Sequence, residues 1–225
     1  MIIAISGKMQ VGKTTMAEVA VEHYGFTRLG FADALKQECF EVLQPSFPTL
    51  ELSAFYSNKQ LLLDATLSNL PELFQAESFR RMCTLHPTTH QPVISLRAIM
   101  QWYGQYRREL DTDYWVQKLV DQLSDYPNIV VDDMRHINEA VYLQILGATL
   151  IRINRPLAIH TATPAHLSET ALDNFPGFHT TINKPATYPL EEFINNCHDH
   201  LRLLLGDYDE TTQPATKATA VFTRK

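Results

Sequence analysis

The sequence predicts an α/β fold: a doubly wound parallel sheet of about five strands, interrupted by a helical insertion. Short apolar runs alternate with helix-like stretches along most of the chain. The first run, Ile2–Ser6, leads into a glycine-rich segment and a helix-like stretch, and a later run, Asn128–Asp132, ends in acids. Parallel strands joined by right-handed crossovers bring such strand ends to one edge of the sheet, where ligands bind.

The individual elements follow from hydrophobic periodicity and from capping residues. Compact apolar runs predict strands at Ile2–Ser6, Phe26–Phe31, Asn128–Asp132, Thr149–Asn154 and Thr180–Asn183. Apolar residues at helical spacing predict helices at Lys13–Tyr24, Asp33–Leu43, Ser95–Leu110, Asp113–Ser124, His136–Leu146 and Leu190–Leu205. Ser95 is a candidate N-cap, because serine side chains accept hydrogen bonds from the first helical turn.

One domain is expected over residues 1–206, with its core in 1–44 and 94–206. The pattern loosens between Pro45 and Pro92, which predicts an insertion at about 45–93 with helical pieces near Leu61–Leu70 and Glu72–Cys83 and a Thr/His/Pro loop. A second excursion, rich in proline, threonine and histidine, is expected at about 155–178. Residues 207–225 are rich in threonine and alanine without periodicity, which predicts a flexible tail.

The composition narrows the function classes. A formal charge of −6 over 225 residues disfavours a protein that coats long nucleic acid, since phosphate-backbone binding needs a basic face. Cys39, Cys83 and Cys197 are widely spaced and form no CxxC pair, so neither a disulfide framework nor a zinc site is expected. The chain begins without a signal-peptide pattern and has no run long enough to span a bilayer, so a cytoplasmic protein without membrane contact is expected.

Gly7–Thr14 fits the pattern G-x-x-x-x-G-K-[ST] of a phosphate-binding loop, or P-loop, and lies between the first predicted strand and helix. Gly7 and Gly12 permit a tight turn that points backbone N–H groups at a polyphosphate. Lys13 supplies a mobile cation for the outer phosphates, and Thr14 supplies an oxygen for Mg²⁺. The fold class is therefore of the P-loop NTPase type, and the expected ligands are ATP and Mg²⁺.

Asp132 and Asp133 follow the apolar pair Val130-Val131, at a strand end where P-loop proteins hold a carboxylate near Mg²⁺. The sequence leaves open which of the two serves the metal and which caps the following helix.

Arginines gather near predicted strand ends and insertions. Guanidinium groups suit bidentate phosphate contacts and stabilise the charge on a transferring phosphoryl group. The candidates are Arg97, Arg107, Arg108, Arg135, Arg152 and Arg155. A solvated surface position is the interpretation for Arg28, Arg80, Arg81, Arg202 and Arg224.

Asp33 and Lys36 lie in the first turn of the second predicted helix, at the carboxyl edge of the sheet. This pair suits an acceptor-binding role; the alternative is an aspartate that interacts with its helix dipole beside a solvated lysine. The segment Gln101–Arg108 mixes aromatic, amide and cationic groups, as a pocket for a base and a phosphate requires. For Trp102 the favoured alternative is core packing.

Several segments together resemble the phage-type deoxynucleoside monophosphate kinases, a branch of the P-loop nucleotide kinase group. Besides the P-loop, they are GFADALK at Gly30–Lys36, LRAIMQWYGQYRR with DTDYWV at Leu96–Val116, VVDDMRHINEA at Val130–Ala140, IRINRP at Ile151–Pro156 and HLSE at His166–Glu169. The resemblance implies Mg²⁺-dependent transfer of the ATP γ-phosphoryl group to a deoxynucleoside 5′-monophosphate, giving a diphosphate for DNA precursor synthesis. It implies an acceptor-binding insertion at about 45–93, a lid at about 155–178 and, for a phage protein, the host cytoplasm.

The resemblance also implies roles for individual residues. The ATP-binding residues would be Gly7, Lys8, Gly12, Lys13, Thr14, Thr15 and Asn183. The acceptor-binding residues would be Asp33, Lys36, Arg97, Gln101, Trp102, Arg107 and Arg108. The catalytic residues would be Lys13, Asp133, Arg135, Arg152 and Arg155, and the metal-binding residues Thr14, Asp132 and Asp133. The chain departs from the family at His136-Ile137, which affects packing, and at Leu167, which weakens a catalytic role for the lid.

Two other functions stay open. If Asp33 is a general base, the acceptor is a hydroxyl group, as in a nucleoside, a coenzyme A precursor or a polynucleotide 5′ end. The other alternative is a nucleotide-binding switch without an acceptor, although the chain lacks an NKxD guanine-reading motif. The accepted base is not predicted, and a homodimer is left open.

Overall fold

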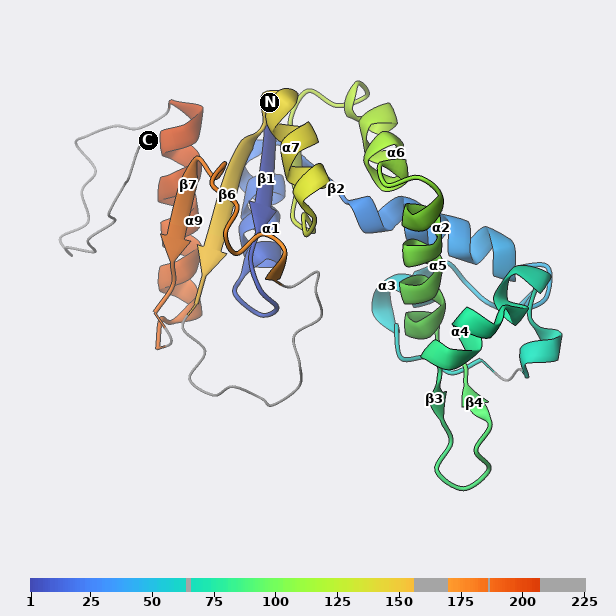
Figure 1. The fold of residues 1–225 in the computed structure, drawn as a ribbon. Helices are drawn as coiled ribbons and strands as arrows, with labels where there is room; N and C mark the ends of the chain where they lie inside the picture. The colour runs from blue at the N-terminus through green and yellow to red at the C-terminus, as the bar shows by residue number, and fades with distance from the viewer. Residues whose placement is uncertain (64–65, 156–169, 186, 207–225) are drawn as a thin grey trace. The chain divides into compact units, whose positions relative to one another are not determined.

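The computed structural model describes residues 1–63, 66–155, 170–185 and 187–206 (Figure 1). These residues form two compact units. The first contains residues 1–30 and the part of the chain after residue 119, and the second contains residues 31–119. The predicted insertion, residues 45–93, lies inside the second unit.

The first unit is built on a five-stranded parallel sheet with the strand order β2-β5-β1-β6-β7. The strands are β1 (Ile2–Ser6), β2 (Thr27–Leu29), β5 (Ile129–Val131), β6 (Thr149–Asn154) and β7 (Thr180–Asn183). Strand β1 is the central strand and pairs with β5 and β6. Its residue Ile3 lies opposite Val130 of β5 on one side and opposite Thr149 of β6 on the other. The predicted five-stranded parallel sheet is confirmed, and the parallel order places every carboxyl end on the same edge.

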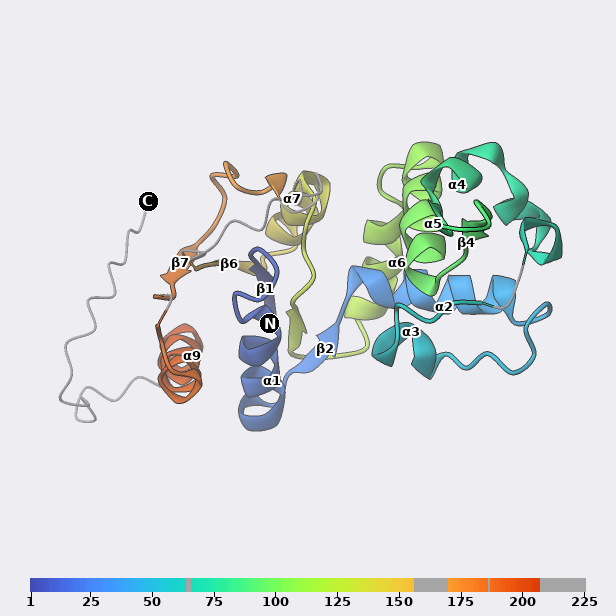
Figure 2. The same cartoon turned by 90° about the horizontal axis from the view of Figure 1, so that it is seen from below.

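Helices cover both faces of this sheet. Helices α1 (Lys13–Tyr24) and α9 (Leu190–Leu205) lie side by side on one face, and α7 (Ile137–Ile145) lies on the other (Figure 2). Met16 of α1 with Phe193 and Cys197 of α9 are fully buried in one hydrophobic cluster with strand residues such as Ile5 and Ile153. This packing fixes the N-terminus of α1 directly after the carboxyl end of β1.

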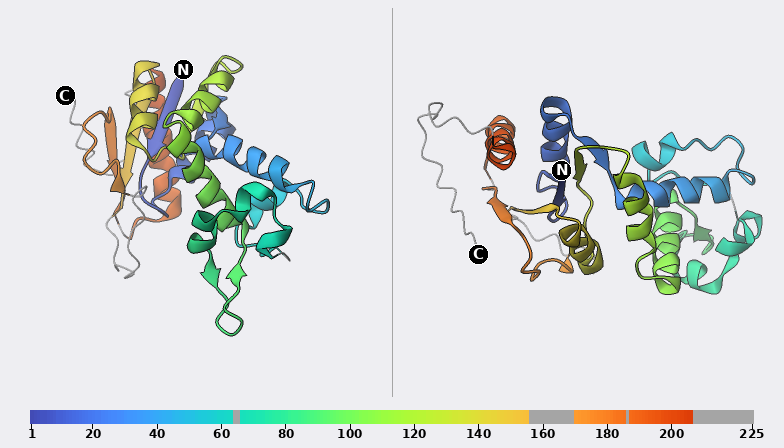
Figure 3. Two further views of the ribbon diagram at one scale, coloured as in Figure 1. Left: turned by 45° about the vertical axis from the view of Figure 1, so that its right-hand side comes forward. Right: turned by 90° about the horizontal axis from the view of Figure 1, so that it is seen from above.

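The second unit is mainly helical. Its elements are α2 (Phe31–Leu43), α3 (Ser53–Ser57), the 3₁₀ turns η1 (Leu67–Asn69) and η2 (Glu72–Gln75), α4 (Glu77–Met82), β3 (Thr84–Leu85), β4 (Pro92–Val93), α5 (Leu96–Leu110) and the first part of α6 (Tyr114–Leu123). The core is aromatic and includes Phe55, Phe74, Phe79, Trp102 and Trp115. Strands β3 and β4 form a hairpin that projects from the helices of this unit (Figure 3).

The structure corrects three of the predicted elements. The strand expected at Phe26–Phe31 ends at Leu29, because β2 pairs only with the three-residue β5 and Phe31 already begins α2. The helical piece near Leu61–Leu70 is extended at its start, since Leu61 and Leu63 exchange backbone hydrogen bonds with Leu96 and Ile94. The Thr/His/Pro loop contains the β3–β4 hairpin. The sequence did not predict this hairpin, because its strands have only two residues each and show no alternation of apolar and polar residues.

Two predicted features fall largely outside the described residues. The expected lid is described only at Arg155 and over residues 170–178, and the expected tail, 207–225, lies outside. Within the described part of the chain, no helix combines the length and the apolar character needed to cross a membrane.

Candidate functional site

The loop between β1 and α1 has the backbone that its glycines predict. Gly12 has φ 111°, and a Cβ atom there would overlap the ring of Phe193. A Cβ atom on Gly7 would overlap the carbonyl oxygen of Ile153 in β6. Glycine is therefore needed at both positions, where it permits the tight turn that leads into the N-terminus of α1.

The side chain of Lys13 folds back over this loop and is bonded to its backbone. Its Nζ donates hydrogen bonds to the carbonyl oxygens of Gly7, at 2.7 Å, and of Lys8, at 2.8 Å. The ammonium group is therefore held over the loop by backbone dipoles, in reach of an anion bound at the helix N-terminus. Lys8 itself is exposed and extends toward Asp173, as described below.

Thr14 and Asp132 come together at the carboxyl edge of the sheet. The Thr14 hydroxyl donates a hydrogen bond of 3.1 Å to Oδ2 of Asp132, which follows β5 and has a side chain only 4% exposed. Of the two acids that the sequence left open, Asp132 is thus the one bonded to the P-loop hydroxyl. A hydroxyl and a carboxylate are hard oxygen donors, so this pair fits Mg²⁺.

The described residues contain no group of three acidic, histidine or cysteine side chains that could hold a metal ion by itself.

Arg28 also belongs to this site. Its side chain is 47% exposed, as the interpretation of a solvated surface position predicted, but its guanidinium group binds Asp132. Its Nε donates to Asp132 Oδ1 at 2.9 Å, and its Nη2 donates to Asp132 Oδ2 at 2.8 Å. The cause is topology: Arg28 lies on β2, which pairs with β5 with Arg28 opposite Val130. The sequence showed both strands but not that they are neighbours, so nothing in it linked this arginine with the acid.

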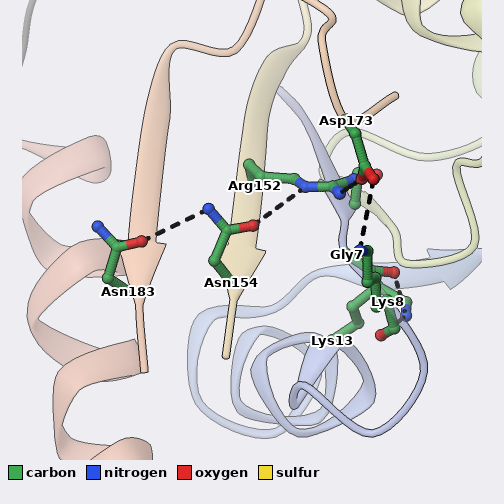
Figure 4. A network of polar contacts seen from close by, with 8 residues as sticks. Gly7, Lys8, Lys13, Arg152, Asn154, Asp173 and Asn183 are labelled. Carbon is green, nitrogen blue, oxygen red and sulfur yellow. Dashed lines mark hydrogen bonds and ion pairs between the residues drawn. The ribbon is translucent and has the colours of Figure 1, made fainter. Parts of the chain in front are cut away.

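Arg152 is the centre of a second polar network, drawn in Figure 4. It lies in β6 and is 7% exposed. Its guanidinium group donates to Ser6 Oγ at 3.0 Å, to Asn154 Oδ1 at 3.3 Å and to a carboxylate oxygen of Asp173. The other oxygen of Asp173 lies 3.4 Å from Lys8 Nζ. Asp173 thus joins a P-loop lysine to a strand arginine, and the sequence gave no signal for it, because it lies in an irregular segment.

A cavity of about 1600 Å³ adjoins this network. Among the residues that line it are Arg152, Phe178, Asn183, Lys184 and the P-loop residue Lys8. The Nζ atom of Lys184 lies 4.1 Å from the centre of the Phe193 ring, and burial together with the charge of Arg155 lowers the pKa of this lysine. The Asn183 side chain accepts a hydrogen bond of 3.4 Å from Asn154. Cations, amides and aromatic rings in one large cavity suit a nucleotide.

In the second unit, Asp33 in the first turn of α2 and Lys36 in the second turn form a close ion pair. Lys36 Nζ lies 2.7 Å from Asp33 Oδ1 and 3.9 Å from the centre of the Tyr56 ring. Burial and the Asp33 carboxylate raise the pKa of the Tyr56 hydroxyl. The lysine side chain is only 11% exposed, so the alternative of a solvated lysine does not describe it. Tyr56 was not singled out by the sequence, because its partners lie on another helix.

Arg107 is engaged in a network around Glu38 in the same unit. Tyr103 and Tyr114 donate to the Glu38 carboxylate at 3.0 and 2.6 Å, and Lys118 lies 3.2 Å from it. Arg107 donates to the Tyr103 hydroxyl at 2.9 Å. Burial alone would raise the pKa of Glu38, but these hydrogen bonds outweigh it and lower the pKa. The arrangement stabilises the junction of α2, α5 and α6.

The other sequence candidates take varied positions. Trp102 is 7% exposed, stacks on Tyr106 and donates to Ser78, so core packing describes its position.

The remaining candidates are exposed or half-buried. Gln101 and Arg97 are exposed on α5, and Arg108 donates to the Gly104 carbonyl at 3.3 Å. Asp133 and Arg155 are half-buried beyond the ends of their strands. Arg135 is exposed, and its backbone amide donates to Glu139 of α7 at 2.7 Å.

Comparison with known proteins adds little to this geometry. No protein-family model matches the chain. No curated protein matches its sequence. Among solved structures, a dephospho-CoA kinase from Campylobacter jejuni is similar with a TM-score of 0.45 and 14% sequence identity, over 90% of this chain and 96% of that chain.

Proposed function

We propose that the protein transfers the γ-phosphoryl group of ATP, with Mg²⁺, to a deoxynucleoside 5′-monophosphate, giving ADP and the deoxynucleoside diphosphate. The observation that carries the proposal is the 3.1 Å contact between Thr14 and Asp132, beside a P-loop whose lysine is held over the phosphate position. When bound, Mg²⁺ would be held by the Thr14 hydroxyl, which is hydrogen-bonded to Asp132. The ion would neutralise charge on the ATP phosphates.

The residues of the first unit account for the donor side. The N-terminal amides of α1 and the Lys13 ammonium group bind the phosphate oxygens, and the cavity beside Arg152 and Asn183 holds the rest of the nucleotide. An oxygen of the acceptor phosphate forms a bond to the γ-phosphorus while the bond to the bridging oxygen of ADP breaks. Lys13 and nearby arginines such as Arg152 and Arg155 stabilise the charge that develops on the transferred group.

The second unit is proposed to bind the acceptor. Asp33, Lys36 and Tyr56 offer a carboxylate, an ammonium group and a half-exposed aromatic ring within one cluster. An acceptor phosphate is already ionised near neutral pH, so the reaction needs alignment and charge neutralisation and no dedicated base.

A hydroxyl acceptor is the second candidate, and Asp33 is the observation that favours it. Its side chain is 38% exposed and belongs to the proposed acceptor cluster, so its carboxylate could take a proton from a hydroxyl group. Hydroxyl acceptors include nucleosides and precursors of coenzyme A. The two candidates share the donor site and differ only in the acceptor.

The deciding experiment measures ADP formation with ATP and Mg²⁺ against each deoxy- and ribonucleoside monophosphate, against nucleosides and a coenzyme A precursor, and without acceptor. Products are resolved by chromatography. A new diphosphate from one or a few deoxynucleoside monophosphates is the expected result. A new monophosphate ester from a hydroxyl compound would replace the main proposal by the second. ADP formed equally in all reactions, with no phosphorylated acceptor, would contradict both.

A further inference from the structure

We infer that Arg28 is the counter-ion of Asp132, so that the metal site accepts a divalent ion only together with a nucleotide. The inference rests on the proposed function for the identity of the site and goes beyond it by assigning a regulatory role to Arg28. It concerns the order in which ligands bind, which neither the P-loop pattern nor the acceptor cluster addresses.

The first step is the burial of Asp132. Its side chain is only 4% exposed, and an ionised carboxylate at such a position needs a cation or several hydrogen-bond donors. Arg28 and Thr14 meet this need. The guanidinium group binds both carboxylate oxygens, at 2.9 and 2.8 Å, and the Thr14 hydroxyl adds a third bond at 3.1 Å.

The second step is the geometry of the arginine. A bidentate guanidinium group covers both oxygens of a carboxylate and supplies one full positive charge to it. Oδ1 and Oδ2 of Asp132 are therefore both engaged, and the pair as a whole is neutral. A free divalent ion that approached Thr14 would meet a neutralised carboxylate and a nearby positive charge, which opposes its binding.

The third step is what a nucleotide changes. Phosphate oxygens of ATP would bring negative charge and metal ligands of their own to the P-loop. Mg²⁺ can then bind while Asp132 stays paired with Arg28 and hydrogen-bonded to Thr14. Arg28 is accessible enough for its effect to be tested by substitution, since its side chain is 47% exposed and lies on the edge strand β2. Changing it does not open a cavity in the core.

The test is Mn²⁺ binding without nucleotide, followed by electron paramagnetic resonance, with Mn²⁺ as the spectroscopic substitute for Mg²⁺. The wild-type protein should bind Mn²⁺ at this site no more tightly than about 1 mM. Arg28→Gln keeps an amide donor but removes the charge, and should bind Mn²⁺ about tenfold more tightly or better. Arg28→Lys, which keeps the charge, should behave like the wild type.

Two further variants show where the new site lies. The double variant Arg28→Gln with Asp132→Asn should lose the added Mn²⁺ affinity. Arg202→Gln, which removes one positive charge from the exposed Arg202–Asp199 pair of α9, should leave Mn²⁺ binding unchanged. Thermal unfolding of every variant confirms that it is folded.

Wild-type protein that binds Mn²⁺ alone as tightly as Arg28→Gln would overturn the inference, and so would an Arg28→Gln variant with no gain. If Arg28→Gln does not fold, Arg28→Met takes its place, because it also removes the charge while keeping an unbranched side chain, and the same gain in Mn²⁺ affinity is expected. Failure of the proposed function is a separate result, because phosphate transfer is measured with acceptors and Mn²⁺ binding is measured without any nucleotide.

Discussion

At the scale of single residues, Lys13 is the group whose position is tied most closely to the phosphate-binding loop. Its ammonium group is held by the carbonyls of Gly7 and Lys8. Lys13→Ala should lower ADP formation by roughly 100-fold or more, because the variant loses the cation that stabilises charge on the transferred group. Steady-state kinetics with ATP and the identified acceptor measures the effect, with thermal unfolding as the check on folding. An active, folded Lys13→Ala protein would contradict the assigned role.

Asp33 separates the two candidate acceptors. With a monophosphate acceptor, Asp33→Asn should mainly raise KM for the acceptor and change kcat by less than about tenfold, because a phosphate needs no general base. With a hydroxyl acceptor, kcat should fall by about 100-fold or more, since proton transfer is lost. Separate determination of kcat and KM distinguishes the cases. Equal KM and kcat for variant and wild type would remove Asp33 from the acceptor site.

The residues that sequence analysis found and those it missed differ in where their partners lie. Lys13 and Thr14 were predicted because the P-loop is a local motif, in which eight consecutive residues define the chemistry. Arg28 and Asp173 were missed because their partners, Asp132 and Arg152, are far away in the sequence. A solvated arginine and an arginine that neutralises a buried carboxylate look the same in one sequence.

At the scale of elements, helix α5 shows how local chemistry defines a boundary. Ser95 precedes the helix, and its hydroxyl accepts a hydrogen bond of 3.2 Å from the Ala98 amide, as its N-cap role predicts. Ser95→Ala should lower the free energy of unfolding by about 1 kcal/mol, because one amide of the first turn loses its partner. Urea denaturation measures the change.

The control for this cap is Ser95→Asn, which keeps an acceptor oxygen and should restore most of the lost stability. If Ser95→Ala and Ser95→Asn are equally destabilised, the cap is not the cause.

Element boundaries were predicted best where the hydrophobic period is uninterrupted. The predicted helix at Lys13–Tyr24 and the strand at Ile2–Ser6 agree with the structure residue for residue. The prediction failed at Leu61–Leu70, where backbone groups bond to Ile94 and Leu96 rather than to the next helical turn. A short apolar segment gives the same pattern whether its hydrogen bonds are local or distant, so the sequence could not decide.

At the scale of the whole molecule, stability should depend on pH through His200. This residue of α9 is 8% exposed, and its Nδ1 lies 2.8 Å from the carbonyl oxygen of Asn196. Burial lowers the pKa of His200 below its ordinary value of 6.5, and the hydrogen bond offsets this only in part. The unfolded chain therefore takes up this proton more readily. The stability that neutral His200 contributes is complete above about pH 6.5 and is lost as the pH falls through the folded-state pKa.

The measurement is the free energy of unfolding at about pH 7.5 and about pH 5.5 for wild type and His200→Gln. The wild type should lose more stability between the two pH values than the variant, since glutamine does not titrate. His90→Gln on the exposed β3–β4 hairpin is the control and should keep the wild-type difference. Equal pH dependence in wild type and His200→Gln would exclude His200 as the source.

The sequence by itself determined the parallel α/β fold and the phosphate-binding loop. Both depend on short-range patterns. The fold follows from apolar runs that alternate with helix-like stretches, and the loop follows from the spacing of its glycines. The structure agrees at Gly12, which has φ 111° and leaves no room for a Cβ atom beside Phe193. Only the tertiary structure decided that Asp132 rather than Asp133 contacts Thr14, that Arg28 neutralises Asp132, and that Asp173 joins Lys8 to Arg152. The physical reason is strand order. Which strands become neighbours depends on the packing of the whole sheet, and charge pairs between strand ends exist only once that order is set.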